Sequence, residues 1–110
     1  MTDEQINAII ATSLGFIEEE PWLDGRKCWA HIDNPNVRHE SIPDFCNDLN
    51  ACHEFEKTLS DGDYNKYYRH LSTACLRDFE NGTHFSADPI SATARQRCEA
   101  YLRMLGKWIE

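Results

Sequence analysis

Acidic side chains and a histidine recur between residues 44 and 56, where the sequence comes closest to a reactive cluster. Their types are those that acid/base catalysis or metal binding requires, and the members are Asp44, Asp48, His53 and Glu54. Asp44 and Asp48 also stand near the start of a predicted helix, where carboxylates cap amide groups and complement the helix dipole. We favour the capping interpretation. A small enzyme that uses His53 or Glu56 is kept as an alternative.

Glu56 is unusual because a helical wheel places it within an apolar stripe that includes Leu49 and Cys52. A buried carboxylate requires a partner or a shifted pKa. We favour a structural ion pair over a binding role. The candidate partners are Arg69, His70, Arg95 and Arg97.

Five cysteines stand at positions 28, 46, 52, 75 and 98. Zinc sites use closely spaced pairs of thiolates and imidazoles, and Cys28 with His31 is the one pair of that kind. An odd number of cysteines at mainly apolar positions favours reduced core thiols over a disulfide framework. The sequence also lacks a glycine-rich phosphate loop, a nucleophile elbow and a zincin helix. We therefore predict no metal, no cofactor and no catalytic residue.

The charge balance and the aromatic residues are the signals for binding. Nineteen Asp and Glu against eleven Lys and Arg give a formal net charge of −8, which disfavours direct binding to nucleic acid or anionic membranes. The same charge favours a partner protein with a basic surface. Exposed aromatic residues are enriched in interface hot spots, and Tyr64 and Tyr67 are two candidates. The predicted partner-binding residues are Glu18, Glu19, Glu20, Trp22, Trp29, Asp44, Asp48 and Glu54.

Arg95 and Arg97 provide an alternative kind of site. They stand at the start of the last predicted helix, where guanidinium groups and helix amides together can bind an anionic ligand. The alternative function is that of a sponge that sequesters a nucleotide signal.

The elements that would position these residues follow from periodicity and capping. Apolar residues at helical spacing predict helices over residues 3–14, from 45 to about 59, over 64–79, and a last helix through residue 105. A capping box at Thr2 starts the first helix, and Ser91 or Thr93, with Gln96 three residues after Thr93, caps the last. Between residues 16 and 43 the helical period is lost, and two or three short strands are expected, the clearest at residues 27–32. A further short strand is possible at residues 84–87. The 110 residues fit one α+β domain, residues 1–110, with helices packed on a small antiparallel sheet.

Three blocks carry a family resemblance: residues 42–59 (IPDFCNDLNACHEFEKTL), 64–71 (YNKYYRHL) and 92–108 (ATARQRCEAYLRMLGKW). With the N-terminal helix that ends in Leu14, Gly15 and Phe16, they resemble the phage ABA sandwich domain family, although Phe16 stands where many relatives carry Trp. The resemblance implies a layered α/β/α-type sandwich and a phage or prophage origin. It implies no activity and supplies no catalytic motif.

These observations together predict a noncatalytic phage accessory protein that binds and inhibits a host protein. The chain has neither a secretory signal at its start nor an apolar stretch near 20 residues, so we expect it to act in the host bacterial cytoplasm. A component of an antiviral defence, such as a CRISPR system, is the expected class of target. The sequence gives no indication of the oligomeric state.

Overall fold

The computed structural model describes residues 1–19, 28–39 and 41–109, and confirms the predicted α+β class. Within these residues the chain forms four α-helices, a 3₁₀ helix and a three-stranded antiparallel sheet. The elements in chain order are α1 (Asp3–Ser13), β1 (Phe16–Glu19), β2 (Cys28–His31), β3 (Asn34–His39), α2 (Leu49–Glu56), α3 (Asp61–Glu80), η1 (Pro89–Ser91) and α4 (Ala94–Met104).

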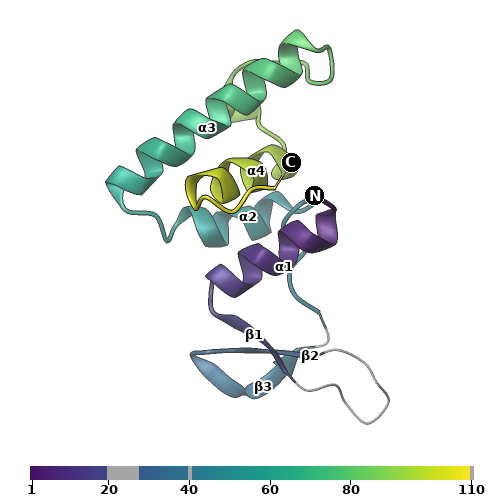
Figure 1. Ribbon diagram of the computed structural model, residues 1–110, viewed down its shortest axis with the longest axis vertical. Helices are drawn as coiled ribbons and strands as arrows, with labels where there is room; N and C mark the ends of the chain where they lie inside the picture. Colours follow the sequence, from purple (N-terminus) through teal and green to yellow (C-terminus); the bar gives the residue numbers. More distant parts are fainter. Residues whose placement is uncertain (20–27, 40, 110) are drawn as a thin grey trace.

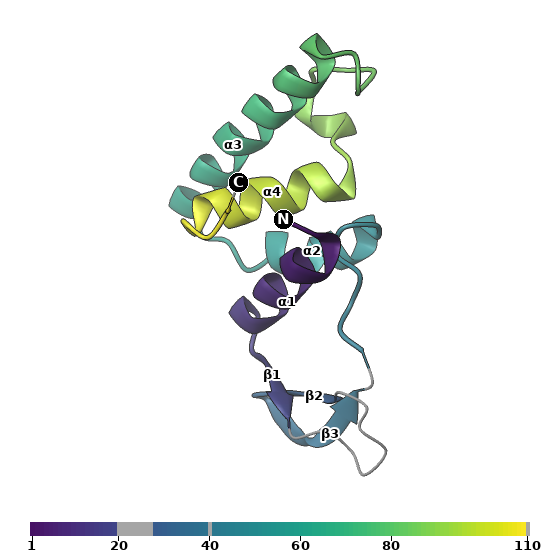
Figure 2. The same ribbon diagram turned by 45° about the vertical axis from the view of Figure 1, so that its right-hand side comes forward.

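The sheet and the helices occupy opposite ends of an elongated molecule that measures 49 × 29 × 23 Å (Figures 1 and 2). The long α3 lies at the outer end, α4 and α2 lie between it and α1, and α1 leads into β1. The main contact between the sheet and the helices runs through α1 and β1. The helices and the sheet are therefore joined mainly through α1 and the strand that follows it. In the described part of the chain, none of the helices combines the length and the apolar character that a bilayer-spanning segment needs.

Two capping boxes start the first and last helices, as predicted. The hydroxyl of Thr2 accepts a hydrogen bond from the amide of Gln5, whose side chain accepts one from the amide of Thr2. Thr93 and Gln96 repeat the arrangement at the start of α4. Each box satisfies amides that the first turn of a helix leaves without partners, so both helix starts are fixed by local sequence.

The junction between α1 and the sheet depends on a glycine. Gly15 has a φ of +99°, and a Cβ there would lie 2.8 Å from Cγ2 of Ile32. Its carbonyl accepts a hydrogen bond from the amide of Ile32, and the His31 ring nitrogen Nε2 lies 2.9 Å from the Leu14 carbonyl. Phe16 packs edge to face against His31, with ring centroids 5.0 Å apart. Backbone conformation and close approach together exclude a side chain at position 15.

The core lies between the four helices and is rich in aromatic residues. Phe55 stacks on Tyr101 with ring centroids 4.4 Å apart and meets Phe45 and Tyr67 at about 6 Å. Aromatic pairs of this kind add to the stabilisation that burial alone provides. The other fully buried large side chains of the helical core include Ile6, Ile10, Cys52, Cys75, Cys98 and Leu102.

Three expectations about the elements are wrong. The second helix begins at Leu49 and not at Phe45, because Asp48 caps it and residues 45–47 form a turn. The shorter helix leaves the Leu49 side chain 48% exposed instead of in the core. Residues 84–87 form no strand, since the chain there turns back onto the end of α3. Of the two tyrosines named as interface candidates, Tyr67 is fully buried in the core, whereas Tyr64 is 46% exposed.

Leu102→Ala should lower the free energy of unfolding by about 2–5 kcal/mol, the usual cost of truncating a leucine in a packed core. Leu49→Ala is the matched control and should change it by no more than about 0.5 kcal/mol, because Leu49 is half exposed. Urea denaturation of both variants measures the difference. Equal losses at the two positions would contradict the packing described here.

Candidate functional site

Glu56 lies at the centre of a polar network that joins three helices. Its Oε2 accepts hydrogen bonds from the Tyr67 hydroxyl at 2.7 Å and from Nη1 of Arg97 at 2.9 Å. Nδ1 of His53 lies 3.1 Å from its Oε1. The side chains of Glu56 and Arg97 are 13% and 16% exposed. The predicted structural ion pair of Glu56 is confirmed, and Arg97 is the partner.

The electrostatics of this network keep Tyr67 as a neutral donor. Burial, together with the hydrogen bond and charge of Glu56, raises the pKa of Tyr67 far above its ordinary value of 10. Burial is the largest single influence on the pKa of Arg97 and lowers it, but the charges and hydrogen bonds of Glu56 and Tyr67 together outweigh burial, and the net shift is upward. Glu56 is thus already held by a hydroxyl and a guanidinium. Both hydrogen bonds end on Oε2, and they account for the mostly buried carboxylate as a structural ion pair.

A second network joins α3 to α4. Arg77 donates to both carboxylate oxygens of Glu99, at 2.8 and 3.1 Å, and to Asp78 at 3.0 Å. Gln96 donates to Asp78 at 2.8 Å, and Arg103 donates to Glu99 at 3.1 Å. The hydrogen bond from Arg77 is the first cause that holds the pKa of Asp78 below its usual 3.8. Sequence reasoning missed this network, although a glutamate among the buried positions of the last helix is a usable signal.

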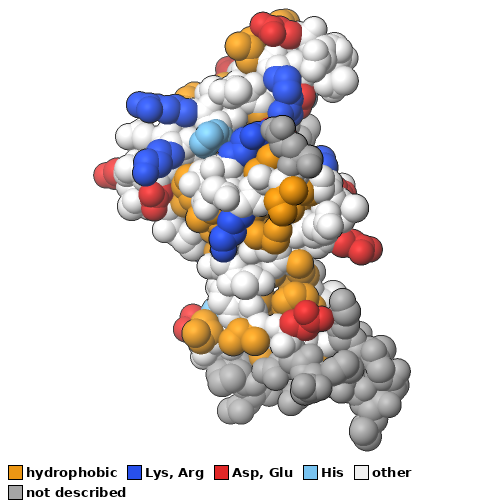
Figure 3. Space-filling view, in the orientation of Figure 1, with side chains coloured by type: hydrophobic (Ala, Val, Ile, Leu, Met, Phe, Trp, Pro, Cys, Tyr) orange, Lys and Arg blue, Asp and Glu red, His pale blue; other side chains and the backbone are white. Residues whose placement is uncertain are grey.

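An apolar hollow of about 660 Å³ lies between α1, the first two strands and the C-terminal residues. Figure 3 shows hydrophobic side chains on this face, over α1 and the C-terminal end and again just above the sheet. We call it the tryptophan groove because Trp29 and Trp108 both line it, each partly buried. Its lining residues are Ala8, Ile9, Thr12, Phe16, Ile17, Glu18, Trp29, Gly106, Lys107, Trp108 and Ile109.

The tryptophan groove has the composition of a protein-contact surface. Two tryptophans, a phenylalanine and three isoleucines offer apolar area, and Glu18 and Lys107 contribute charge. Trp108 is held in place by Arg103, whose guanidinium lies 5.4 Å from the indole centroid. Concave apolar surfaces with a few polar groups are where proteins place ligands and partner side chains.

The predicted partner-binding residues divide between this groove and structural roles. Glu18 and Trp29 both line the groove, whereas Asp48 caps α2 by accepting from the amides of Asn50 and Ala51. Glu54 pairs with Lys57 on the surface. Glu19 pairs with Cys28 in the sheet, but its side chain, Glu20 and Trp22 lie outside the described residues.

Asp44 has a different structural role from the helix cap that was expected. Its carboxylate accepts hydrogen bonds from the side-chain amides of Asn7 and Asn47. Asn7 in turn accepts from the amide of Cys46, so the turn before α2 is attached to α1. Asp44 and Asp48 thus anchor the chain ahead of α2.

The two arginines of the nucleotide alternative do not form a joint anion site. Arg95 pairs with Asp3 and also donates to the Met1 carbonyl, while Arg97 points to Glu56 on another side of α4. Both guanidinium groups therefore already bind carboxylates. An anionic ligand would have to displace these carboxylates.

The five cysteines are buried thiols and none of them forms a disulfide. Within the described ranges no group of three or more His, Cys, Asp or Glu has the geometry to hold a metal ion. Cys28 and His31 both lie in β2, at its two ends.

Comparison with known proteins adds no relative. A scan against protein-family models, a search of curated proteins and a search of solved structures each found no match to this chain. The functional argument therefore depends on the geometry of the chain itself.

Arg97→Ala should lower the free energy of unfolding by about 3–5 kcal/mol, because it leaves the mostly buried Glu56 carboxylate without its cationic partner. Arg95→Ala is the matched control from the same helix and should cost no more than about 1 kcal/mol, since both members of its pair are about half exposed. Chemical denaturation at neutral pH measures both. If the two variants lost the same stability, the Glu56 network would not be the stronger connection.

Asp78 should make stability depend on pH in the acidic range. Its pKa is lower in the folded than in the unfolded chain, so its contribution is complete above about pH 4 and is lost as the pH falls through the folded value. Asp78→Asn should remove that component while keeping an acceptor for Gln96. Arg77→Gln, which removes the main cause of the shift, should flatten the same dependence. Urea denaturation between about pH 2 and pH 6 checks this, and an unchanged pH profile in Asp78→Asn would contradict it.

Proposed function

We propose that this protein is a noncatalytic phage accessory protein that binds and inhibits a host protein through the tryptophan groove. The observation that carries the proposal is the groove itself, in which Trp29 and Trp108 come together from distant parts of the chain. Tryptophan has the highest enrichment in binding hot spots, where it fills or lines desolvated pockets. The groove provides a place where apolar side chains of a partner protein become buried.

The charge of the chain supports a basic partner. A formal charge of −8 attracts a cationic protein surface and speeds its association, while it disfavours nucleic acid as a direct ligand. Many host proteins that act on nucleic acid carry such basic surfaces. Components of antiviral defence such as CRISPR systems are therefore the first class of target to test, and membership of the phage ABA sandwich family stays a prediction.

The alternatives have less support from the described geometry. A nucleotide sponge would need Arg95 and Arg97, and each of these already pairs with a carboxylate. An enzyme would need His53 or Glu56, and Glu56 is held by Tyr67 and Arg97. The residues of neither alternative line a hollow as large as the tryptophan groove.

Ile17→Ser with Ile109→Ser should reduce affinity for the host protein about tenfold or more, because both side chains line the groove. The matched control is Ile32→Ser, since all three isoleucines are between 52% and 66% exposed and Ile32 is not among the groove residues. Affinity capture from lysate of bacteria that carry a CRISPR system, quantified by mass spectrometry for each form, selects proteins that depend on the groove. Calorimetry with the purified protein then measures affinity.

Salt provides the second measurement on the same complex. Association should slow as the Debye length falls from about 10 Å at 0.1 M to about 3 Å at 1 M, and Glu18→Lys should slow it further.

Capture of the same proteins by the wild-type chain and by the Ile17→Ser, Ile109→Ser double variant would overturn the role of the groove. Recovery of a bound nucleotide and of no protein would replace the inhibitor with the sponge.

A further inference from the structure

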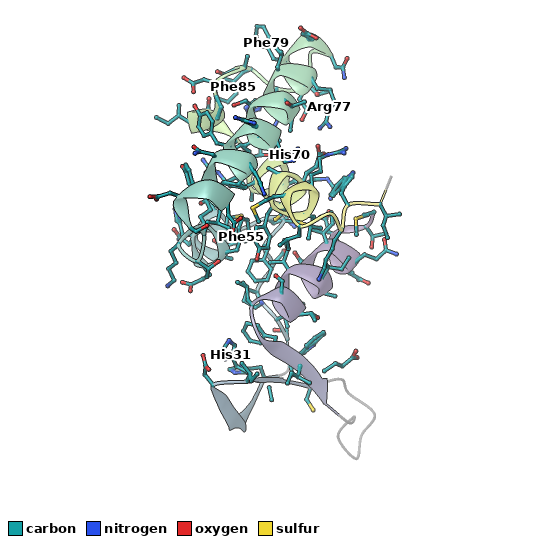
Figure 4. The ribbon with its side chains drawn as sticks, turned by 60° about the vertical axis from the view of Figure 1, so that its left-hand side comes forward. His31, Phe55, His70, Arg77, Phe79 and Phe85 are labelled. Carbon is teal, nitrogen blue, oxygen red and sulfur yellow. The ribbon has the colours of Figure 1, made fainter. Side chains whose placement is uncertain are left out.

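A second apolar surface lies at the far end of the molecule from the sheet. Phe85 and Ile90 are 81% and 84% exposed, far more than large apolar side chains usually are. Phe79 is half exposed, and Figure 4 shows Phe79 and Phe85 at the same end of α3. Leu76 lies half exposed one turn before Phe79. We call these four residues, Leu76, Phe79, Phe85 and Ile90, the α3 tip.

Hydrogen bonds fix the backbone that carries the α3 tip. The amides of Thr83 and His84 both donate to the Asp78 carbonyl, so the chain folds back onto the last turn of α3. Asp88 caps η1 by accepting from the amide of Ile90, and η1 packs against α3. Because these elements are fixed before any partner binds, a partner would lose little free energy in ordering them.

A polar atom at the same end also lacks a partner. Nε2 of His84 is buried and has no hydrogen-bond partner among the described residues, and its ring lies 4.8 Å from that of Phe85. Such a buried polar atom destabilises the free protein unless a partner or solvent satisfies it. This end of the molecule therefore combines uncovered apolar side chains with an unsatisfied polar group.

The charges around the α3 tip are acidic. Residues 76–91 contain Asp78, Glu80 and Asp88 but a single Lys or Arg, which is Arg77. Arg77 forms ion pairs with Glu99 and Asp78, whereas Glu80 and Asp88 are exposed. The segment that carries the apolar residues thus also carries exposed carboxylates, which favour a partner with cations beside its own apolar residues.

We propose that the α3 tip is a second protein-contact surface, and that it binds a basic amphipathic helix of a partner protein. A helix of this kind presents apolar side chains along one face and lysine or arginine beside them, which matches apolar residues flanked by Glu80 and Asp88. A second copy of this chain fits poorly, because its charge of −8 and its own acidic tip would repel the first. The same charge disfavours an anionic membrane.

This inference goes beyond the tryptophan groove, because the two surfaces are formed by different elements of the molecule. The groove is formed by α1, the sheet and the C-terminal residues, whereas the tip belongs to α3 and η1 (Figures 1 and 4). A partner that occupies one surface leaves the other accessible. Either surface can therefore fail its test without affecting the other.

The test uses a fluorescein-labelled peptide of about 18 residues, built from leucine and lysine in a helical amphipathic pattern, titrated with the full-length protein and followed by anisotropy. Two peptides serve as controls: one with serine for leucine at the same charge, and one with glutamate for lysine. Phe85→Ser with Ile90→Ser should weaken binding of the leucine/lysine peptide about tenfold or more. Glu80→Gln with Asp88→Asn should weaken it about threefold to tenfold, and the side-chain oxygen kept at position 88 can still accept from the amide of Ile90.

Two variants make the result specific to the tip. Glu4→Gln with Asp61→Asn removes two exposed charges elsewhere, and Ile17→Ser with Ile109→Ser alters the groove; both should bind the peptide as the wild type does. Absence of binding, binding that Phe85→Ser with Ile90→Ser leaves unchanged, or equal binding of the serine/lysine peptide would each overturn the proposal. So would a loss with the groove variant that matches the loss with the tip variant.

Discussion

Glu56 accepts hydrogen bonds from Tyr67 and Arg97 where little water reaches it, and this carboxylate determines how three helices fit together. α2 supplies the acid, α3 the hydroxyl and α4 the guanidinium. A carboxylate left alone at this depth would destabilise the fold, so each helix must approach with its donor in place. The aromatic cluster of Phe55, Tyr67 and Tyr101 packs on the same helices, so Tyr67 belongs to both the polar network and the apolar core.

The position of the sheet is set by a different constraint. Gly15 allows the chain to turn sharply from α1 into β1, and the close approach of Ile32 and His31 leaves no room for a side chain there. The tryptophan groove depends on this junction, because α1 forms one wall and Phe16, Ile17 and Trp29 form another. The geometry of the candidate site is therefore a consequence of one backbone position outside it.

Local signals predicted much of the fold, and tertiary features account for the errors. The caps at Thr2 and Thr93 depend on residues three apart in sequence, so both helix starts follow from the sequence. Leu49 was misplaced because Asp48, and not Asp44, caps the second helix, which puts Leu49 at the first position of α2, where it stays exposed. Glu56 was recognised as an acid in an apolar stripe, yet the choice of Arg97 over Arg95 required the orientation of α4. The groove could not be predicted as a whole, because its walls come from both ends of the chain and from the sheet.

The burial of all five thiols makes each cysteine a reporter of where the structure opens. An alkylating reagent reaches a buried thiol when the surrounding structure unfolds locally or globally. Cys28 lies in the sheet, whereas Cys52, Cys75 and Cys98 lie in the helical core. Alkylation rates resolved by peptide would therefore separate opening of the sheet from opening of the helices in the unmodified chain. A sheet that opens independently would expose Cys28 first, and a fully cooperative molecule would expose all of them at one rate.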